Sequence, residues 1–498
     1  MKESFLETIF KQLVEKENIR TNLSNLRKEI KEESKKARVL ELLEENQDLI
    51  IGFLKSEDAK TRKNAALLLG DLEYQPASEA LYHAYQEETT LFVRASYLQA
   101  LAELDAHEYL SEFKARVDVL SKKEITPENK KHIEEEIRAL RKILICYEGI
   151  NQHTPDVKGK KVTVLLLTNR TQRETVKRMV EGAKAVVHPL GVLVETDNLY
   201  SLMQLRTYRE MVFPLNRKEF LSSNPLEAAK QVWESDIMQI LNGLHKEQGG
   251  FYFRIECKSA MTLEERSVFT KKMASELEYL SKGDLVNSTS DYEVELRLIA
   301  NKEGLFYPCL RLATLKNRRF SYRKNAIASS IHPSTAALIM ELAKDYLKEN
   351  AQIIDPFCGV GTMLIERDIK VPAREIYATD IFGDAIVYGR ENATAAGEKI
   401  NFIHRDFFDF KHDYLFDEIV TNMPLRGKKT KQEMDDFYRD FFEKAKEILK
   451  QDAVIVMYTN EIGFVKKHLR LQKCYTLLQE TCLQPKNDFN LLIMKYKG

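Results

Sequence analysis

From about residue 350 onward, short apolar runs alternate with longer segments in which apolar residues recur at helical spacing. Strands that alternate with helices in this way form a parallel sheet with helices on both faces, and ligands bind at the carboxyl ends of the strands. Two further apolar runs then follow each other closely and predict an antiparallel hairpin that closes the sheet. The seven expected strands cover residues 353–355, 376–379, 400–404, 418–421, 454–459, 474–480 and 489–495.

The middle of the chain, residues 161–320, shows both kinds of pattern and is expected to form a separate α/β domain. The segment before it, residues 151–160, is polar and contains Pro and Gly, as linkers do. Near the end of the domain, Val294, Leu296 and Leu298 alternate with charged residues, which is typical of a strand. The expected strands are 162–168, 192–195, 251–257 and 292–299, and the expected helices are 171–187 and 267–280.

The first part of the chain, residues 1–150, is expected to be helical. The segment 59–72 aligns with 91–104 at an offset of 32 residues, with Arg, small residues and Leu at matching positions. This pattern is similar to HEAT-type helical repeats, in which helix pairs stack because no pair can bury its apolar face alone. Such an array would either bind a protein partner or act as a purely structural scaffold, and the sequence leaves both roles open.

The overall composition excludes some classes of protein. A chain of 498 residues is too long for one hydrophobic core, so two to four domains are expected. Lys and Arg total 76, as do Asp and Glu, so binding of nucleic acid would require a local basic patch. The six cysteines are scattered without a C-x-x-C spacing, which argues against a disulfide framework and a metal cluster and favours the reducing cytoplasm. No apolar run reaches the roughly 18–20 residues of a membrane span, and the N-terminus has no signal-peptide core.

The first strand of the C-terminal pattern leads into a glycine-containing turn and then a helix start, the order that cradles nucleotide-type cofactors. Asp355 ends the apolar run, and Gly359 and Gly361 permit positive φ and close approach of a ligand to the backbone. A helix that begins near Thr362 would offer unpaired N–H groups to a polar or anionic ligand. This stretch, Asp-Pro-Phe-Cys-Gly-Val-Gly-Thr, resembles motif I of S-adenosylmethionine-dependent nucleic-acid methyltransferases.

Aspartates also stand at the ends of the next two expected strands. Asp380 lies 19 residues after Gly361, where a carboxylate accepts hydrogen bonds from ribose hydroxyls in dinucleotide-binding folds. The resemblance implies that Asp406 contacts the adenine amino group, and that residues 321–498 form a Rossmann-like class I methyltransferase domain with S-adenosylmethionine as cofactor. The predicted cofactor contacts are Asp355, Phe357, Gly359, Gly361, Thr362, Asp380, Ile381, Asp406, Phe407 and Asn422.

A second motif follows the fourth strand. Asn422-Met423-Pro424-Leu425 resembles motif IV, (Asp/Asn)-Pro-Pro-(Tyr/Phe), of enzymes that methylate exocyclic amino groups. The lone pair of such an amine is delocalised into its ring, so the amine is a poor nucleophile. An Asn oxygen and a neighbouring backbone carbonyl can accept its two N–H bonds and hold the nitrogen in line with the methyl group. Asn422, Met423 and Pro424 are therefore the predicted catalytic residues.

This sequence departs from motif IV at two positions. Met423 replaces the first proline, a change that keeps the backbone carbonyl. Leu425 replaces the aromatic residue that stacks on an unpaired or flipped-out base. The second departure leaves both the target base and catalytic activity open.

Basic residues with interleaved aromatic residues cluster before the cofactor loop, and further basic residues follow motif IV. Basic side chains bind phosphates, and aromatic rings stack on unpaired bases. The segments 253–256 and 285–297, with the helix between them, look like the latter half of a THUMP module, and 328–338 resembles the segment before motif I in THUMP-linked methyltransferases. The middle domain would then be a ferredoxin-like, THUMP-like RNA-binding region. The predicted RNA contacts are Arg318, Arg319, Tyr322, Arg323, Arg426, Lys428 and Lys429.

The resemblance to THUMP-linked RNA methyltransferases implies transfer of a methyl group from S-adenosylmethionine to N2 of guanosine in structured RNA, in the first place tRNA. Motif IV does not distinguish between amines, so N6-methylation of adenine stays open, although the THUMP-like region favours RNA. The other alternative is a catalytically inactive assembly factor that binds RNA or protein. The expected partners are RNA and, through the N-terminal helices, a protein; no membrane association is expected.

Overall fold

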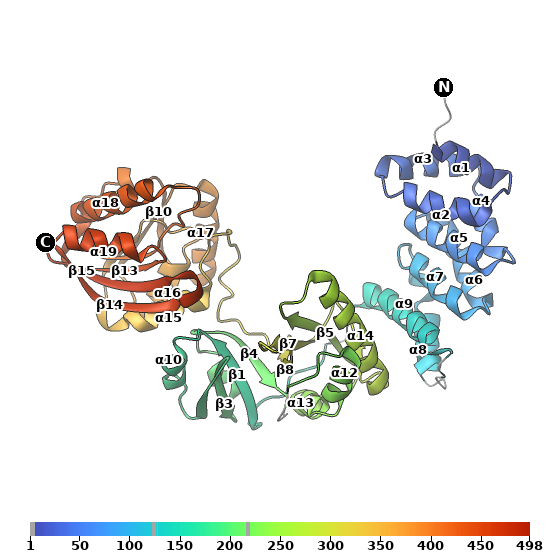
Figure 1. Cartoon of the computed structure of the whole chain (residues 1–498), viewed down its shortest axis with the longest axis horizontal. Coiled ribbons are helices and arrows are strands. Elements are labelled where there is room, and N and C mark those ends of the chain that lie inside the picture. Colours follow the sequence, from blue (N-terminus) through green and yellow to red (C-terminus); the bar gives the residue numbers. More distant parts are fainter. Residues whose placement is uncertain (1–4, 122–125, 127, 151, 216–219) are drawn as a thin grey trace. The chain divides into compact units, whose positions relative to one another are not determined.

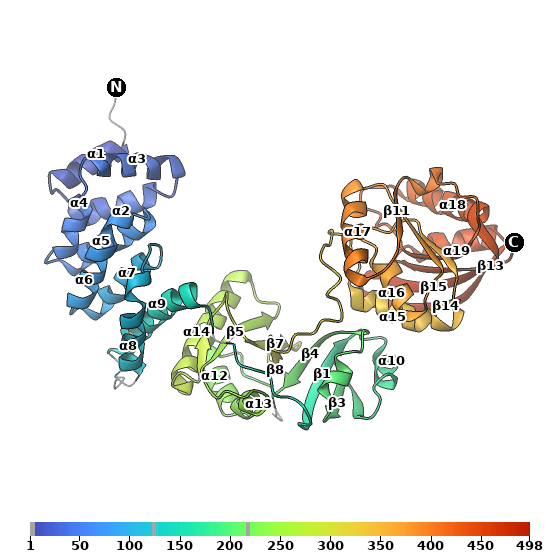
Figure 2. The same cartoon turned by 180° about the vertical axis from the view of Figure 1, so that it is seen from behind.

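The computed structural model of the chain describes residues 5–121, 126, 128–150, 152–215 and 220–498. The chain divides into two compact units. The first unit consists of residues 1–152, 250–252 and 278–292, and the second of residues 153–249, 253–277 and 293–498. Figures 1 and 2 show helices in the N-terminal part of the chain and strands with helices in the middle and C-terminal parts.

The N-terminal part of the first unit is helical throughout its described residues, as the sequence predicts. Its α-helices are α1 (Phe5–Val14), α2 (Ile19–Glu29), α3 (Glu33–Glu44), α4 (Leu49–Gly52), α5 (Ala59–Asp71), α6 (Ser78–Glu87), α7 (Leu91–Leu101), α8 (Leu110–Ser121) and α9 (Lys130–Glu148). Short 3₁₀ turns lie at Phe53–Lys55, Gln75–Ala77 and His107–Tyr109.

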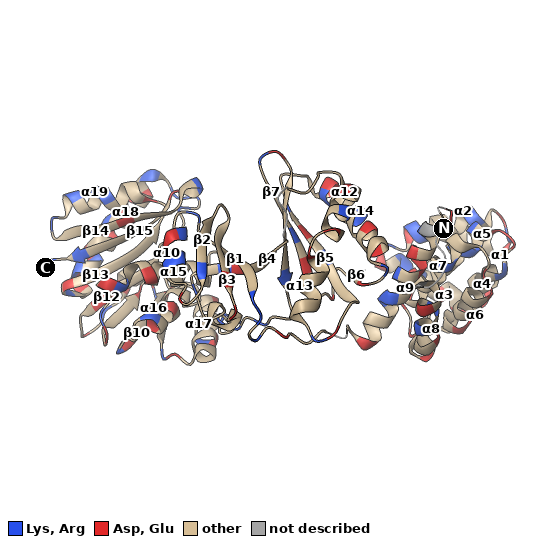
Figure 3. Ribbon diagram, turned by 90° about the horizontal axis from the view of Figure 1, so that it is seen from below, with Lys and Arg blue, Asp and Glu red and all other residues tan. Residues whose placement is uncertain are grey.

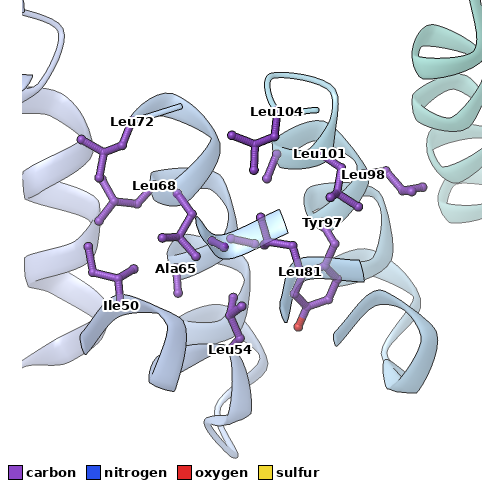
Figure 4. Packing of buried hydrophobic residues seen from close by; sticks show 14 of the residues in the cluster. Ile50, Leu54, Ala65, Leu68, Leu72, Leu81, Tyr97, Leu98, Leu101 and Leu104 are labelled. Atoms are coloured by element: carbon purple, nitrogen blue, oxygen red, sulfur yellow. The ribbon is translucent and has the colours of Figure 1, made fainter. Parts of the chain in front are cut away.

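The two repeated segments form α5 and α7, which pack closely against each other. A Cβ atom added to Gly70 would lie 2.6 Å from the Cα atom of Ala100, so the helices can approach this closely only because position 70 is glycine. Leu68, Leu98 and Leu101 belong to the buried cluster around this contact (Figure 4). The small residues of the repeat therefore serve helix packing.

The arginine that recurs in the repeat also has a structural role. Arg62 donates from Nε to Glu88 Oε2 at 2.8 Å, and Arg94 donates from Nε to Glu136 Oε1 at 3.1 Å. Both glutamates are buried, and a buried carboxylate must be paired to remain charged at low cost. Each repeat arginine thus ties its helix to a neighbouring segment of the array.

The middle of the chain forms a mixed sheet of eight strands in the order β2-β3-β1-β4-β8-β7-β5-β6. The strands are β1 (Val162–Thr168), β2 (Lys184–His188), β3 (Gly191–Thr196), β4 (Tyr208–Pro214), β5 (Phe251–Lys258), β6 (Leu285–Asn287), β7 (Val294–Ala300) and β8 (Phe306–Leu312). The helices are α10 (Arg173–Arg178), α11 (Leu199–Leu202), α12 (Pro225–Trp233), α13 (Ile237–Leu244) and α14 (Leu263–Ser281). All four strands and the second helix expected from the sequence are present.

The prediction of a helix over residues 171–187 is wrong. Only α10 is helical, and the last four residues of that segment, 184–187, belong to β2. Gly182 between them has a φ of 67°, which a continuous helix does not allow. Val186 and Val187 are β-branched and pair in β2 with the antiparallel strand β3, so strand pairing overrides the helical spacing of the sequence.

The C-terminal part forms a seven-stranded sheet in the order β11-β10-β9-β12-β13-β15-β14. Its strands are β9 (Gln352–Asp355), β10 (Glu375–Asp380), β11 (Asn401–His404), β12 (Phe416–Asn422), β13 (Leu449–Thr459), β14 (Tyr475–Gln484) and β15 (Phe489–Tyr496). The first five are parallel, and β15 is antiparallel to both β13 and β14. Each of the seven segments expected from the sequence is therefore a strand.

Helices cover both faces of this sheet: α15 (Pro333–Ala343), α16 (Thr362–Lys370), α17 (Gly383–Ala396), α18 (Lys431–Ile448) and α19 (Ile462–Leu471). Successive residues of a strand point to opposite faces. Ile419 of β12 accordingly packs in one cluster with Phe441 of α18, whereas Val420 packs in another with Leu338 of α15. Because both faces are covered, the central strands carry apolar residues at consecutive positions, such as Ile353-Ile354, Ile419-Val420 and Val454–Met457.

Charged residues of both signs are intermingled along the ribbon in both units, in keeping with a net charge of zero (Figure 3). None of the described helices combines the length and the apolar character that crossing a bilayer requires.

Candidate cofactor and acceptor site

The loop after β9 is shaped by two glycines in left-handed conformations. Gly359 has a φ of 50° and Gly361 a φ of 78°, and α16 begins directly after Gly361. Asp355 accepts a hydrogen bond from the Phe357 backbone N–H at 3.0 Å, which fixes the start of the turn. A Cβ atom on Gly361 would lie 2.9 Å from Cζ of Phe402, so a side chain at this position is excluded by space as well as by backbone conformation.

Parallel pairing brings the predicted aspartates to one edge of the sheet. Ala378 of β10 is level with Asp355 of β9, and Asp380 is level with His404 at the end of β11. Asp380 accepts from the Gly359 N–H through Oδ2 at 2.8 Å and from the Phe382 N–H through Oδ1 at 2.9 Å. Its carboxylate therefore holds the glycine loop while keeping lone pairs for a ligand.

Asp406 follows β11 and starts a short 3₁₀ turn, Phe407–Asp409. Its Oδ1 accepts from the Phe408 N–H at 3.0 Å, and the residue is exposed. Asp406 is thus oriented by the backbone and accessible to a ligand, as the prediction for a cofactor contact requires.

A cavity of about 410 Å³ opens at this edge of the sheet. The predicted cofactor-binding and catalytic residues that line it are Asp355, Phe357, Gly359, Thr362, Asp380, Ile381, Asp406, Phe407, Asn422, Met423 and Pro424. Gly361 shapes the loop but is not in the lining. The strand-end residues of β9, β10 and β12 and the loop after β11 therefore converge on one cavity.

Sequence reasoning missed part of the lining. The additional residues are Ile327, Ser329, Ser330, Ile331, Phe382, Phe408 and Phe437, with others of the loops already described. The first four lie in or next to the segment 328–338, which was singled out by resemblance alone and not as a binding segment. Phe437 lies on α18, where nothing in the sequence separates a cavity residue from a core residue.

The cavity wall fits a cofactor that carries positive charge and polar groups. Asp355 is buried, and burial raises the pKa of its carboxyl to about 7. Among the described residues, neither Asp355 Oδ2 nor Thr362 Oγ1 has a hydrogen-bond partner. Buried polar atoms without partners are costly, so these two atoms mark places where a ligand would stabilise the wall.

Motif IV lies at the end of β12, with Asn422 level with Tyr458 of β13. The Met423 N–H donates to the Tyr458 carbonyl at 2.9 Å, and the Met423 side chain is buried in the core. A proline at this position could not donate that hydrogen bond, so methionine here is accommodated by the fold. Leu425 also lines the cavity and is 55% exposed.

A tight turn joins motif IV to α18. Arg426 donates from Nε to the Lys429 carbonyl at 2.8 Å, the Lys429 N–H donates to the Arg426 carbonyl at 3.1 Å, and Gly427 has a φ of 57°. Thr430 and Glu433 then form a capping box that fixes the start of α18. Lys428 is exposed, and Lys429 lines the cavity.

The basic stretch before the cavity is only partly available to RNA. Tyr322 is 4% exposed and donates its hydroxyl to Glu366 of α16 at 2.7 Å, so the predicted base stacking by this ring is wrong. Arg206 forms a two-pronged ion pair with the same Glu366, at 2.7 and 2.8 Å. Tyr322 and Arg206 thus connect the middle of the chain to the helix that follows the glycine loop.

Arg319 also has structural partners. Its guanidinium lies 3.5 Å from the ring centroid of Tyr208 and donates to the carbonyls of Leu205 and Arg209, at 2.8 Å each. Burial lowers the pKa of Arg319 to about 10. Its predicted contact with a phosphate is corrected to a packing role, whereas Arg318 is exposed and Arg323 is half-buried.

The fold and the cavity define a class of protein: an α/β domain with a strand–glycine loop–helix cradle and an Asn-x-Pro motif at the acceptor side. Residues 321–477 match the family profile described as RMKL-like, methyltransferase domain. The C-terminal domain is therefore a methyltransferase domain, and the cofactor of this class is S-adenosylmethionine.

Particular relatives are similar to parts of the chain. The Bifunctional methyltransferase of Rickettsia felis is 29% identical over 186 residues, which cover 33% of this chain and 34% of the relative. The tRNA (guanine(10)-N2)-dimethyltransferase of Methanothermobacter thermautotrophicus is 27% identical over 155 residues, which cover 30% of this chain and 45% of the relative. The chain thus spans less than half the length of either relative. The crystal structure of TrmN from Thermus thermophilus is similar with a TM-score of 0.49 and 19% identity, over 68% of this chain and 99% of that one.

Proposed function

We propose that the protein transfers a methyl group from S-adenosylmethionine to an exocyclic amine of a base in structured RNA, specifically N2 of guanosine in tRNA. The observation that carries this proposal is the position of Asn422, on the wall of the same cavity as Asp380 and Asp406. The similarity to a protein named as a tRNA guanine-N2 dimethyltransferase supports the choice of base and RNA.

In this proposal, some residues of the cavity bind the cofactor and others bind the acceptor base. The cofactor, when bound, supplies a methyl group attached to a positively charged sulfur. Asp380 and Asp406 would bind its hydroxyl and amino groups, and the buried Asp355 lines the same cavity. The Asn422 side-chain oxygen and the backbone carbonyl of Met423 or Pro424 accept the two N–H bonds of the acceptor amine, which orients its lone pair.

The remaining parts of the chain serve RNA binding and assembly in this proposal. Residues 1–150 form a HEAT-like array that binds a protein partner, 161–320 a THUMP-like RNA-binding region, and 321–498 the methyltransferase domain. Arg318, Arg323, Arg426, Lys428 and Lys429 provide phosphate contacts around the cavity, and the protein acts in the cytoplasm.

The proposal is tested by incubating purified protein with tRNA and labelled S-adenosylmethionine, followed by mass spectrometry of the nucleosides. We expect N2-methylguanosine, and we expect Asn422→Ala to lower kcat by about 100- to 1000-fold, the usual loss when one transition-state hydrogen bond is removed. Asp380→Ala should instead weaken cofactor binding, and the exposed Gln432→Ala serves as control. If the product is N6-methyladenosine, the acceptor base is adenine and not guanine.

A second candidate function rests on Leu425. In place of the stacking aromatic residue, this exposed leucine offers no flat ring to a base. If the protein binds S-adenosylmethionine and tRNA but methylates neither tRNA nor rRNA, an RNA- or protein-binding assembly factor is the better description.

A further inference from the structure

Three phenylalanine rings from separate segments meet on the wall of the cavity. Phe357 comes from the glycine loop, Phe408 from the turn after β11 and Phe437 from α18. The Phe437 ring centroid lies 5.4 Å from that of Phe357 and 5.6 Å from that of Phe408, in tilted and edge-on arrangements. Contacts of this geometry hold the Phe437 ring from two sides.

The turn after motif IV brings Lys429 to this ring. The Lys429 ammonium lies 4.6 Å from the ring centroid of Phe437, and both residues border the same cavity as Asn422 and Leu425. The capping box at Thr430 fixes the start of α18, which lies between the lysine and the ring in sequence. The motif IV loop thus places a cation over an aromatic face beside the acceptor-orienting asparagine.

An exocyclic amine can be methylated only when its base leaves the stack, and a base in that state needs a flat apolar surface. Leu425 does not provide one. We propose that Phe437 is the aromatic platform for the acceptor base, that Lys429 covers this face in the empty site, and that the entering nucleotide displaces the ammonium, which then pairs with its phosphate. This inference rests on the proposed function, because it identifies how that site recognises its substrate.

Replacement of the Lys429 ammonium by a base on the Phe437 ring is expected to be favourable. An exposed cation–π contact is weaker than stacking of a base on an aromatic ring, and the displaced ammonium regains an ionic partner in the phosphate. The lysine has a flexible four-carbon stem, so its head can move while its backbone stays in the turn. The arrangement therefore selects for an acceptor that has both a planar ring and a phosphate.

The experiment uses full-length protein with S-adenosylhomocysteine bound. Trp233 is the single tryptophan of the chain, so Phe437→Trp adds one fluorescent reporter at the proposed platform, and the parent protein reports the background. Titration with a guanosine-containing oligoribonucleotide should quench the added fluorescence in a saturable way and leave the parent unchanged. Absence of quenching under conditions where tRNA methylation proceeds would overturn the platform while leaving the proposed function intact. Quenching without methylation of any RNA would support the platform and contradict the proposed activity.

Kinetic variants provide the second readout. Phe437→Leu should lower kcat/KM for tRNA at least tenfold, mainly through KM, with unchanged affinity for the cofactor, whereas Phe437→Tyr should retain activity. Lys429→Gln should raise KM for an oligonucleotide but not for guanosine, and should reduce the salt slope of RNA binding by about one. Phe464→Leu is the matched control, because Phe464 stacks on Tyr438 of α18 at 6.0 Å and does not line the cavity. A kcat/KM of Phe437→Leu equal to that of the parent would contradict the inference.

Discussion

At the scale of single residues, the buried carboxyl of Asp355 makes the stability of the folded protein depend on pH. Its carboxyl is buried with one oxygen lacking a partner among the described residues, and burial raises its pKa to about 7. In the unfolded chain the same group titrates near 3.8. The folded protein therefore disfavours the ionised form, and the resulting loss of stability grows as pH rises from 3.8 to about 7 and is complete above that.

We predict that Asp355→Asn raises the thermal midpoint of the cofactor-free protein by several degrees at pH 8. The neutral amide avoids the cost of burying a charge, so the difference from the parent should shrink toward pH 5 and disappear near pH 4. Thermal unfolding at these three pH values measures it. The exposed Asp413→Asn should leave the midpoint unchanged throughout, and a difference for Asp355→Asn that did not depend on pH would contradict the explanation.

Predicted site residues at strand ends lie where the sequence placed them, at one edge of the sheet. Asp380 and Asn422 could be placed because a strand pattern fixes where its carboxyl end lies, and all parallel strands end at one edge. Tyr322 and Arg319 could not be interpreted in this way. Their aromatic and basic character suggested RNA contacts, but their partners Glu366 and Tyr208 lie more than 40 and 100 residues away in sequence, so burial could not be inferred. For the same reason, the sequence did not indicate that Phe437 lines the cavity.

At the scale of secondary-structure elements, the packing of α17 on β11 depends on Phe402. A Cβ atom on Gly389 of α17 would lie 2.4 Å from Cε1 of this ring, which also fills the space beside Gly361 in the cofactor loop. The ring is buried, so it has little freedom to move away from an added methyl group. Helix packing and loop shape are therefore coupled through one side chain.

Gly389→Ala should destabilise the protein by about 1–3 kcal/mol, the usual cost of overpacking, although alanine favours helices. It should also weaken cofactor binding, because displacement of Phe402 disturbs the loop at Gly361. Gly463→Ala on α19 is the control, since no atom lies within 4 Å of its added Cβ, and it should be neutral or stabilising by up to about 1 kcal/mol. Denaturant unfolding and cofactor titration measure both effects; equal behaviour of the two variants would refute the packing argument.

The sequence predicted elements well where composition and spacing agreed. The central strands of the C-terminal sheet carry short uninterrupted apolar runs, such as Ile353-Ile354 and Val454–Met457, because both faces are covered. The segment 171–187 was different, because its apolar residues suited a helix while its valines and Gly182 suited a hairpin. The partner strand β3 decided the outcome, and a local pattern does not contain that information.

At the scale of the whole molecule, Glu366 provides one of the contacts between the middle and C-terminal parts of the second unit. This carboxylate is 1% exposed and binds Arg206 from the middle of the chain and Tyr322 from the segment before α15. Removing the cation from a buried pair leaves an uncompensated charge, which is more costly than removing both partners.

Arg206→Met should destabilise the protein by about 2–3 kcal/mol, toward the low end for a buried pair because the arginine is 23% exposed. The double variant Arg206→Met/Glu366→Gln should recover part of this loss, since glutamine still accepts the Tyr322 hydroxyl. Free energies of unfolding, measured with guanidinium for these variants, give the coupling free energy between Arg206 and Glu366. Arg439→Met, at an exposed ion pair, should change stability by less than about 1 kcal/mol, and an equally small effect of Arg206→Met would show that the contact contributes little.

The position of β15 has a consequence for how the protein is made. This strand follows the other six strands of its sheet in sequence, yet it lies between β13 and β14. Until it is available, β13 has an open edge and β14 has no neighbour in the sheet. An unpaired strand edge is a template for strands of other molecules. The nascent sheet therefore carries an aggregation hazard that ends only when β15 is inserted, and loss of residues 489–496 would make that hazard permanent.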